Sequence, residues 1–240
     1  MDSALTLRPV TERGWRSGLG NLFRREFRVW WGTRFGLWQI VIWTVAINGI
    51  FAIVLSSGDI NLEAVTGITS IFTSIGVIVL AQGAIVGEKA SGTAAWILSG
   101  PVSRRAFLLS KLIPLAIGSL ALMIVLPGII GFVEYSVIPA TAADPSPLFF
   151  ASGLGVLGLY LVFFMTLTIM LGTFFQSRGV VLGVAFGVTA GSMLPQTLLP
   201  WQVYAATPWA MGQTMSAAMM QGQPFVVDGN TIATAIPLLA

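Results

Sequence analysis

The chain has 240 residues, of which 55% are hydrophobic and only 9% are charged, and its net charge is +3. A typical soluble domain carries about 25% charged residues, so this chain lacks the polar side chains that a water-exposed surface needs. Because the sequence contains no Cys and no His, disulfides, thiolate metal sites and most hydrolase arrangements are excluded. The composition therefore predicts an integral membrane protein.

Residues 1–34 form a basic cytoplasmic arm that lacks the short apolar core and the small-residue cleavage site of a signal peptide. Within it we expect residues 10–33 to form one amphipathic helix on the membrane surface, because apolar side chains recur at helical spacing. This stripe comprises Trp15, Leu19, Leu22, Phe23, Phe27 and Trp30, with Arg16, Arg24, Arg25 and Arg28 beside it. The arginines suit anionic lipid headgroups. A plain membrane anchor is favoured, and additional packing against a cytoplasmic partner stays open.

Residues 35–240 are predicted to form an all-α transmembrane domain of six helices. A helix needs about 20 apolar residues to cross a hydrocarbon core of about 30 Å. Five segments meet this requirement, at 35–56, 64–86, 112–133, 148–175 and 179–199. A further apolar run starts at Thr231 and reaches Ala240, which is about half the required length. We therefore expect the sixth helix to be incomplete in this sequence and the natural chain to continue.

The distribution of basic residues predicts the orientation. All 12 Lys and Arg residues precede the first segment, lie between the second and third, or lie between the fourth and fifth. The other connections carry only acidic charges. By the positive-inside rule, the N-terminus is cytoplasmic in a multi-pass protein of the inner or plasma membrane. Since the basic residues adjoin membrane segments, nucleic acid is not expected as a partner.

Few residues inside the spans have polar side chains that could bind a substrate or take part in catalysis. Asn48 and Gln82 are candidates for lining a translocation path, although isolated amides more often tie neighbouring membrane helices together. The motifs HExxH and GxSxG and the Walker A lysine motif are absent from the sequence. We therefore expect no catalytic residue, no metal site and no cofactor bound by this chain.

The connection at 87–105 is too polar to span lipid and too apolar for an ordinary solvated loop. Gly92 is expected to end the second span in a left-handed conformation, and Thr93 to cap a short helix at 94–98. Gly100-Pro101 should end that helix, and Ser103 should cap the third span. Arg104 and Lys111 are seven residues apart and should share one helical face at the headgroup level. The short helix either dips into the interface or docks on a cytoplasmic protein.

This pattern resembles the permease subunits of ABC-2 type ATP-binding-cassette transporters. The matching residues of the loop are Glu88, Gly92-Thr93, Ile97-Leu98 and Pro101-Val102-Ser103-Arg104, followed by Lys111. The opening Phe23-Arg24-Arg25-Glu26-Phe27 and the outer segments Thr207-Pro208-Trp209 and Gly222-Gln223-Pro224 are similar as well. The resemblance covers the whole chain in topology and is specific over residues 86–111.

The resemblance implies a membrane-spanning permease subunit that moves a substrate, usually outward, with ATP hydrolysed by a separate ATPase subunit. This chain is then not itself an enzyme, and ATP and Mg belong to the partner. A second permease subunit, identical or different, is also implied. The implied ATPase-contact residues are Glu88, Gly92, Thr93, Trp96, Ile97, Leu98, Pro101, Ser103, Arg104 and Arg105, with Trp96 and Leu98 as the apolar anchors.

Two alternatives remain open at this point. Some relatives of this kind support the maturation of periplasmic metalloenzymes, and a scaffold or immunity protein of the membrane would not transport at all. An intramembrane enzyme is disfavoured, because the chain has no His and no acidic pair inside the spans.

Overall fold

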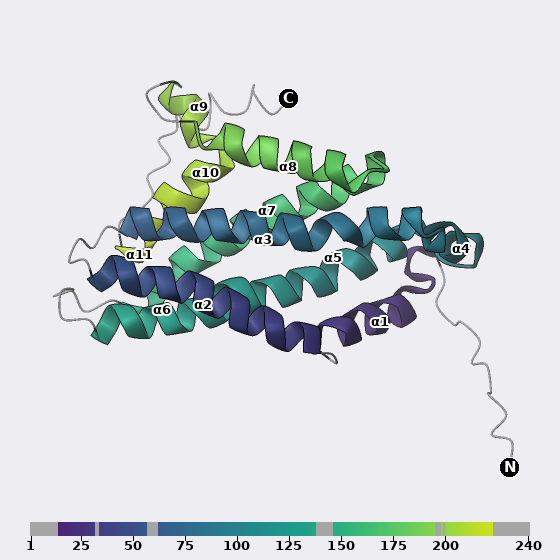
Figure 1. The fold of residues 1–240 in the computed structure, drawn as a ribbon, viewed down its shortest axis with the longest axis horizontal. Helices are drawn as coiled ribbons and strands as arrows, with labels where there is room; N and C mark the ends of the chain where they lie inside the picture. Colours follow the sequence, from purple (N-terminus) through teal and green to yellow (C-terminus); the bar gives the residue numbers. More distant parts are fainter. Residues whose placement is uncertain are drawn as a thin grey trace, which may run out of the picture.

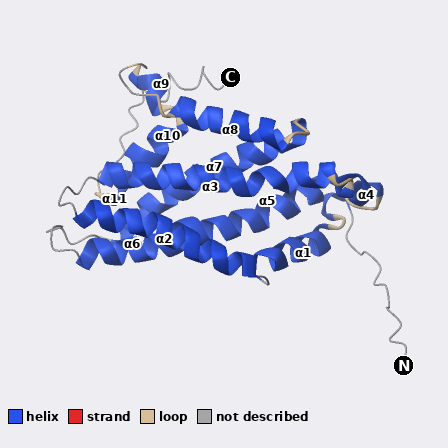
Figure 2. Cartoon of the chain, in the orientation of Figure 1, coloured by secondary structure: helices blue, strands red, loops and turns tan. Residues whose placement is uncertain are grey.

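The computed structural model describes residues 14–31, 34–56, 62–137, 146–194, 198 and 200–222. All regular structure in these ranges is helical (Figure 2). The long helices lie roughly side by side in one bundle (Figure 1). The expected start of a sixth helix at Thr231 falls outside the described residues.

Four helices of the described chain are long and apolar enough to cross a membrane: Gly36–Ser56, Val65–Ala90, Arg104–Val137 and Pro147–Phe174. They correspond to α2 (Arg34–Ser56), α3 (Leu62–Ala90), the continuous run of α5 (Arg104–Leu120), η2 (Ala121–Val125) and α6 (Leu126–Val137), and α7 (Pro147–Phe174). These four helices overlap the predicted spans at 35–56, 64–86, 112–133 and 148–175.

The third of these helices is longer than the predicted span at 112–133, since it begins at Arg104 and ends at Val137. A span estimated from apolar residues stops at the first charges, whereas the helix itself continues through the headgroup region. The π-helical turn η2 ends at Val125, two residues before Pro127. A proline in a helix lacks the N–H that would bind the preceding turn, and π turns adapt the backbone at such places.

The predicted fifth span at 179–199 is shorter in the structure. α8 (Arg178–Ser192) has 15 residues and is therefore about 22 Å long, and the chain leaves the helix at Met193. Four short helices follow: α9 (Trp201–Ala205), α10 (Pro208–Ala210), η3 (Met211–Met215) and α11 (Ser216–Met220). The last two pack on α3 and α7.

The core lies between α3, α5, α7 and α8. Its most deeply buried large side chains include Ile78, Met123, Tyr160, Phe164 and Met165. Small residues let these helices approach closely, as is usual in membrane bundles. For example, a Cβ on Gly172 of α7 would lie 3.3 Å from Cβ of Ile85 on α3.

The N-terminal arm does not form the single helix expected at 10–33. A short 3-10 turn, η1 (Gly14–Arg16), is followed by a bend and then by α1 (Leu19–Trp31). The bend is at Gly18, which has a φ of 80°, and a Cβ there would lie 2.7 Å from Cγ2 of Val102. Trp15 therefore lies outside α1. The structure does not describe residues 10–13 and 32–33 or the side chain of Trp30.

The apolar stripe of α1 packs along α5. Leu19, Leu22, Phe23 and Phe27 are partly buried, whereas Arg24, Arg25 and Arg28 are exposed. The rings of Phe23 and Phe27 stack with centroids 5.8 Å apart. Trp15 is 46% exposed and has the guanidinium of Arg16 over its ring.

Candidate functional site at the α4 end of the bundle

The short helix α4 (Thr93–Ser99) projects at one end of the bundle, beyond the long helices (Figure 1). We call this region the α4 end. Gly92 has a φ of 75°, which confirms the predicted left-handed turn. The predicted cap at Thr93 is wrong, because Gly92 occupies the N-cap position and no side chain caps the helix. Thr93 is already the first helical residue, and its hydroxyl lies 2.9 Å from Oγ of Ser91.

The two faces of α4 differ in burial. Ala94 and Ile97 are 7% and 8% exposed and belong to the main core. Trp96 points away and is 79% exposed, and Leu98 is 36% exposed. α4 is therefore held by the bundle on one side and presents a large apolar side chain on the other.

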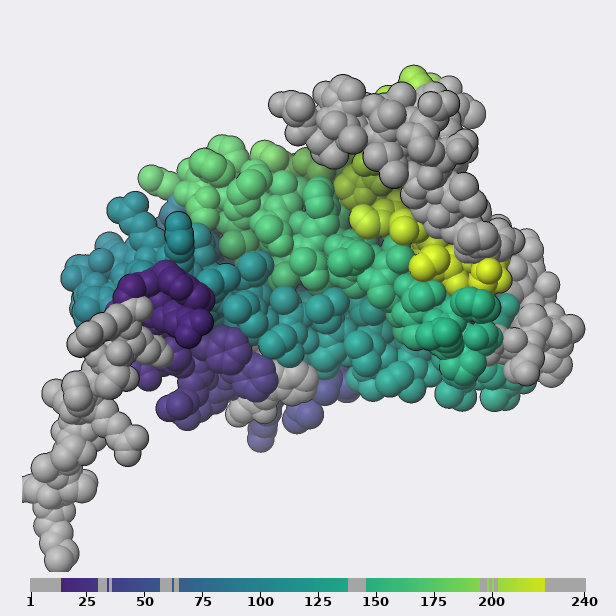
Figure 3. Space-filling view, turned by 180° about the vertical axis from the view of Figure 1, so that it is seen from behind, coloured from purple at the N-terminus to yellow at the C-terminus, as the bar shows by residue number. Residues whose placement is uncertain are grey.

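The connection after α4 is tied to the N-terminal turn. Ser17 Oγ donates a hydrogen bond to the carbonyl of Pro101, and Ser103 Oγ donates to the carbonyl of Trp15 at 2.5 Å. The Ser103 N–H also donates to the carbonyl of Ser17 at 3.2 Å. In the space-filling view, the purple N-terminal residues lie directly against the blue-teal surface of this region (Figure 3). We call these contacts the N-terminal latch.

Ser103 has a second role, which the sequence predicted. Its Oγ accepts a hydrogen bond from the Ala106 N–H at 3.0 Å and so caps α5. A helix leaves its first N–H groups without partners, and an N-cap hydroxyl satisfies one of them. One side chain therefore both starts α5 and holds the N-terminal turn.

An ion cluster around the buried Lys111 joins three helices next to α4. Lys111 of α5 is 7% exposed, and its Nζ lies 2.6 Å from Oε1 of Glu26 on α1. The same Nζ pairs with Oε1 of Glu88 at the end of α3. The expectation that Lys111 faces headgroups together with Arg104 is wrong, because Arg104 is exposed and Lys111 is enclosed by two carboxylates. Acidic partners on other helices lower the cost of burying this charge.

A second basic residue fastens the end of α3 to α7. Lys89 Nζ donates to the carbonyls of Gly172 at 2.9 Å, Thr173 at 2.5 Å and Phe175 at 3.4 Å. These carbonyls belong to the last turn of α7 and its cap, where a cation is favoured by the helix dipole. Sequence reasoning predicted no contact for Lys89 or Glu26, since their partners are distant in the sequence.

The ten implied ATPase-contact residues thus fall into two groups. Trp96, Leu98, Pro101, Arg104 and Arg105 are exposed, as is the turn residue Gly92. Ile97, Glu88 and Ser103 are engaged inside the chain itself, and Thr93 is half-buried. The exposed group forms the outer surface of the α4 end, whereas the inner group holds that surface in place.

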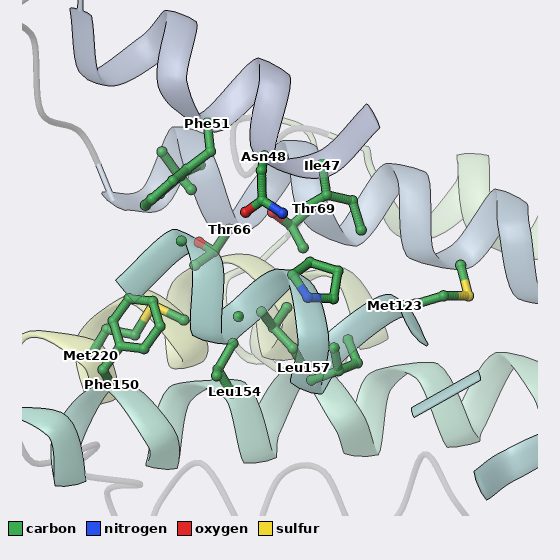
Figure 4. Close-up of a pocket in the computed structure, with 15 residues that line it drawn as sticks. Ile47, Asn48, Phe51, Thr66, Thr69, Met123, Phe150, Leu154, Leu157 and Met220 are labelled. Atoms are coloured by element: carbon green, nitrogen blue, oxygen red, sulfur yellow. The ribbon is translucent and has the colours of Figure 1, made fainter. Parts of the chain in front are cut away.

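Asn48 and Gln82, the two candidate path residues, do not share one cavity. Asn48 lines a pocket of about 40 Å³ between α2, α3, α6 and α7, with Thr66 and Thr69 nearby (Figure 4). Its Nδ2 donates to the carbonyl of Thr44 at 3.1 Å, and its Oδ1 has no hydrogen-bond partner among the described residues. The space suffices for about two or three water molecules.

The described residues contain no group of three or more acidic side chains that could hold a metal ion. Fold and site together define a multi-pass helical membrane protein with a short helix at one end that exposes the large apolar side chain of Trp96. A family model described as "ABC-2 family transporter protein" matches residues 22–223. The chain belongs to this family, and it is a membrane component of a transport system. A search of curated proteins returned no match.

Proposed function

We propose that this chain is the permease subunit of an ABC-2 transporter, which exports a substrate with the energy of ATP hydrolysed on a separate ATPase subunit. Membership of the family supports the transport role. The observation that supports the coupling role is α4, on which Trp96 is 79% exposed while Ile97 is 8% exposed. ATP and Mg²⁺ are bound by the ATPase, and a second permease subunit, identical or different, completes the membrane part.

The proposed topology has six spans and a cytoplasmic N-terminus in the inner or plasma membrane. The α4 end carries the basic residues of α1, of the start of α5 and of the start of α8 (Figure 1). This placement favours the cytoplasm by the positive-inside rule. In this scheme α8 belongs to the fifth span, the sixth begins at Thr231, and α1 lies at the interface with its arginines towards the headgroups.

Force applied to α4 is passed to several helices at once. Ala94 and Ile97 engage the core, the N-terminal latch joins the α4–α5 connection to the turn before α1, and Lys111 joins α1, α3 and α5. A movement of the ATPase against Trp96 would therefore displace the ends of these helices together. In this proposal Trp96 and Leu98 are the apolar anchors, Pro101, Arg104 and Arg105 are outer contacts, and Glu88, Gly92, Thr93, Ile97 and Ser103 shape and hold the loop.

The direct test is the amount of ATPase that copurifies per permease in detergent. Trp96→Ala should reduce it strongly, because truncating a buried aromatic anchor costs about 2 kcal/mol or more of binding, or about thirty-fold in affinity. Leu98→Asp should have a similar effect. Trp38→Ala is the matched control, since Trp38 of α2 is 65% exposed and is not part of α4.

An unchanged ratio with both α4 variants would overturn the coupling role. Absence of any ABC ATPase from the wild-type preparation would instead support a non-transporting scaffold or immunity protein. A permease-like subunit serving periplasmic metalloenzyme maturation would still retain the ATPase, and only its substrate would differ.

A further inference from the structure

A cleft at the α4 end is formed by α1, α3, α5 and α8 and has a volume of about 420 Å³. Arg25 of α1 and Arg178 of α8 both line it, together with the ion cluster around Lys111. Part of the remaining wall is apolar and includes Val29 and Leu80. The cleft therefore combines cationic and apolar surfaces.

The two arginines make the charge of this cleft positive, because Lys111 with its two carboxylate partners carries −1 and Arg25 and Arg178 add +2, which gives +1. Lys111 is paired with both Glu26 and Glu88. Among the described residues, the ion pairs are those of Lys111, and neither Arg25 nor Arg178 has an acidic partner. The cleft therefore has a net positive charge, which favours an anion, and guanidinium groups bind phosphate with two parallel hydrogen bonds.

A neighbouring groove extends the cationic surface along α1. It has a volume of about 360 Å³ and is lined by Asn21, Arg24, Arg25, Arg28 and Val29. Because Arg25 and Val29 line both spaces, the groove and the cleft adjoin each other. The combined surface is large enough for a headgroup with its glycerol backbone.

The position of Arg178 depends on a glycine. A Cβ on Gly87 of α3 would lie 3.0 Å from Nη2 of Arg178, so the missing side chain lets the guanidinium lie close against α3. Gly83, one turn earlier, also lines the cleft, and a Cβ there would meet no atom within 4 Å. The floor of the cleft is thus open beside the cation.

We propose that this cleft binds the phosphate group of an anionic phospholipid of the cytoplasmic leaflet, with Arg25 and Arg178 as its ligands. The proposal rests on the proposed topology, which places the α4 end at that leaflet. Basic pockets between membrane helices on the cytoplasmic side are suited to anionic headgroups, and the apolar wall suits the glycerol backbone and the first part of the acyl chains. A lipid bound there joins α1 to α8.

The test uses the purified full chain in detergent, with binding measured by native mass spectrometry and by the shift of the thermal unfolding midpoint. Short-chain phosphatidylglycerol should bind and raise the midpoint. Phosphatidylcholine of the same chain length should have little effect, and so should glycerol 3-phosphate. An equal shift with glycerol 3-phosphate would mean a site for soluble phosphate esters and would overturn the lipid assignment.

Variants locate the site. Arg178→Gln and Arg25→Gln should each weaken phosphatidylglycerol binding about five-fold, which corresponds to about 1 kcal/mol per charge. Arg105→Gln removes the same charge from an exposed position that does not line the cleft and should leave the affinity unchanged.

A filling variant tests the cleft without changing charge. Gly83→Leu should reduce binding at least as much as Arg178→Gln, whereas Gly49→Leu, on a helix face that is also open, should not. Unchanged affinity in both Arg178→Gln and Gly83→Leu would overturn the proposal. Arg105 is a proposed outer contact of the ATPase, but Arg25, Arg178 and Gly83 are not, so ATPase copurification of the cleft variants reports separately on the proposed function.

Discussion

The buried Lys111 of α5 and the partly buried Glu26 of α1 form an ion pair, with 2.6 Å between Nζ and Oε1, across 85 positions of sequence. Glu88 at the end of α3 contacts the same ammonium group. One cation thus joins the N-terminal helix to two membrane helices next to α4.

Replacing Lys111 by Met should therefore detach α1. The change leaves two carboxylates facing each other without a cation, and breaking a buried pair in this way costs about 3–5 kcal/mol. The free energy of unfolding in detergent measures the loss, and proteolysis at the bend before α1 measures the detachment. Arg104→Met is the control, because Arg104 is exposed and its loss should cost less than about 0.5 kcal/mol.

A triple variant separates charge from packing. Glu26→Gln and Glu88→Gln added to Lys111→Met remove the uncompensated charges and should recover much of the lost stability, since neutral replacements of buried ion clusters are often tolerated. If Lys111→Met alone is as stable as the wild type, the cluster does not hold α1.

Gly18 should tolerate alanine poorly. Its φ of 80° costs an alanine about 1–2 kcal/mol, and the new Cβ would also lie 2.7 Å from Val102. Gly14→Ala is a matched control, because Gly14 has a φ of 68° but no atom within 4 Å of a Cβ. Faster amide exchange at residues 14–18 and 101–103 in Gly18→Ala than in Gly14→Ala would report the clash. Equal exchange in the two variants would argue against a close contact between the N-terminal turn and Val102.

Ser103→Ala should weaken both the start of α5 and the N-terminal latch. Loss of an N-cap hydroxyl costs about 0.5–2 kcal/mol, and the bond to the carbonyl of Trp15 is lost as well. Ser99→Ala serves as the control, since its exposed Oγ donates only within α4, to the carbonyl of Trp96. The free energies of unfolding of the two variants should differ by about 1 kcal/mol, and equal values would contradict a latch role for Ser103.

The proposed topology can be tested in whole cells, because the chain has no Cys. Arg104→Cys lies at the α4 end, and Ser136→Cys is exposed near the opposite end of the same continuous helix. A membrane-impermeant thiol reagent should label position 136 in intact cells and position 104 only after the membrane is opened. The reverse pattern would invert the orientation.

The parts of this site that depend on neighbouring residues could be predicted from the sequence. The left-handed turn at Gly92 and the cap at Ser103 follow from local backbone chemistry, and the short helix follows from its flanking breakers. The buried face of α4 could also be predicted from neighbouring residues, because Ala94 and Ile97 are three residues apart and so lie on one helical face.

The parts of the site that depend on packing between distant segments could not be predicted from the sequence. The sequence alone indicates that Lys111 is a cation at the membrane interface. In the folded chain, α1 and α3 place Glu26 and Glu88 beside it. The break at Gly18 requires the approach of Val102, which only the folded chain supplies. The end of α8 at Ser192 was also missed, since the apolar composition continues beyond the helix.

The most direct test of the coupling role is photocrosslinking from position 96 in native membranes. A photoreactive amino acid in place of Trp96 should give an adduct whose second component is identified by mass spectrometry as an ABC ATPase. The same substitution at Trp38, which is also exposed, should not give it. Absence of the ATPase adduct at position 96, or equal adducts at both positions, would contradict the account.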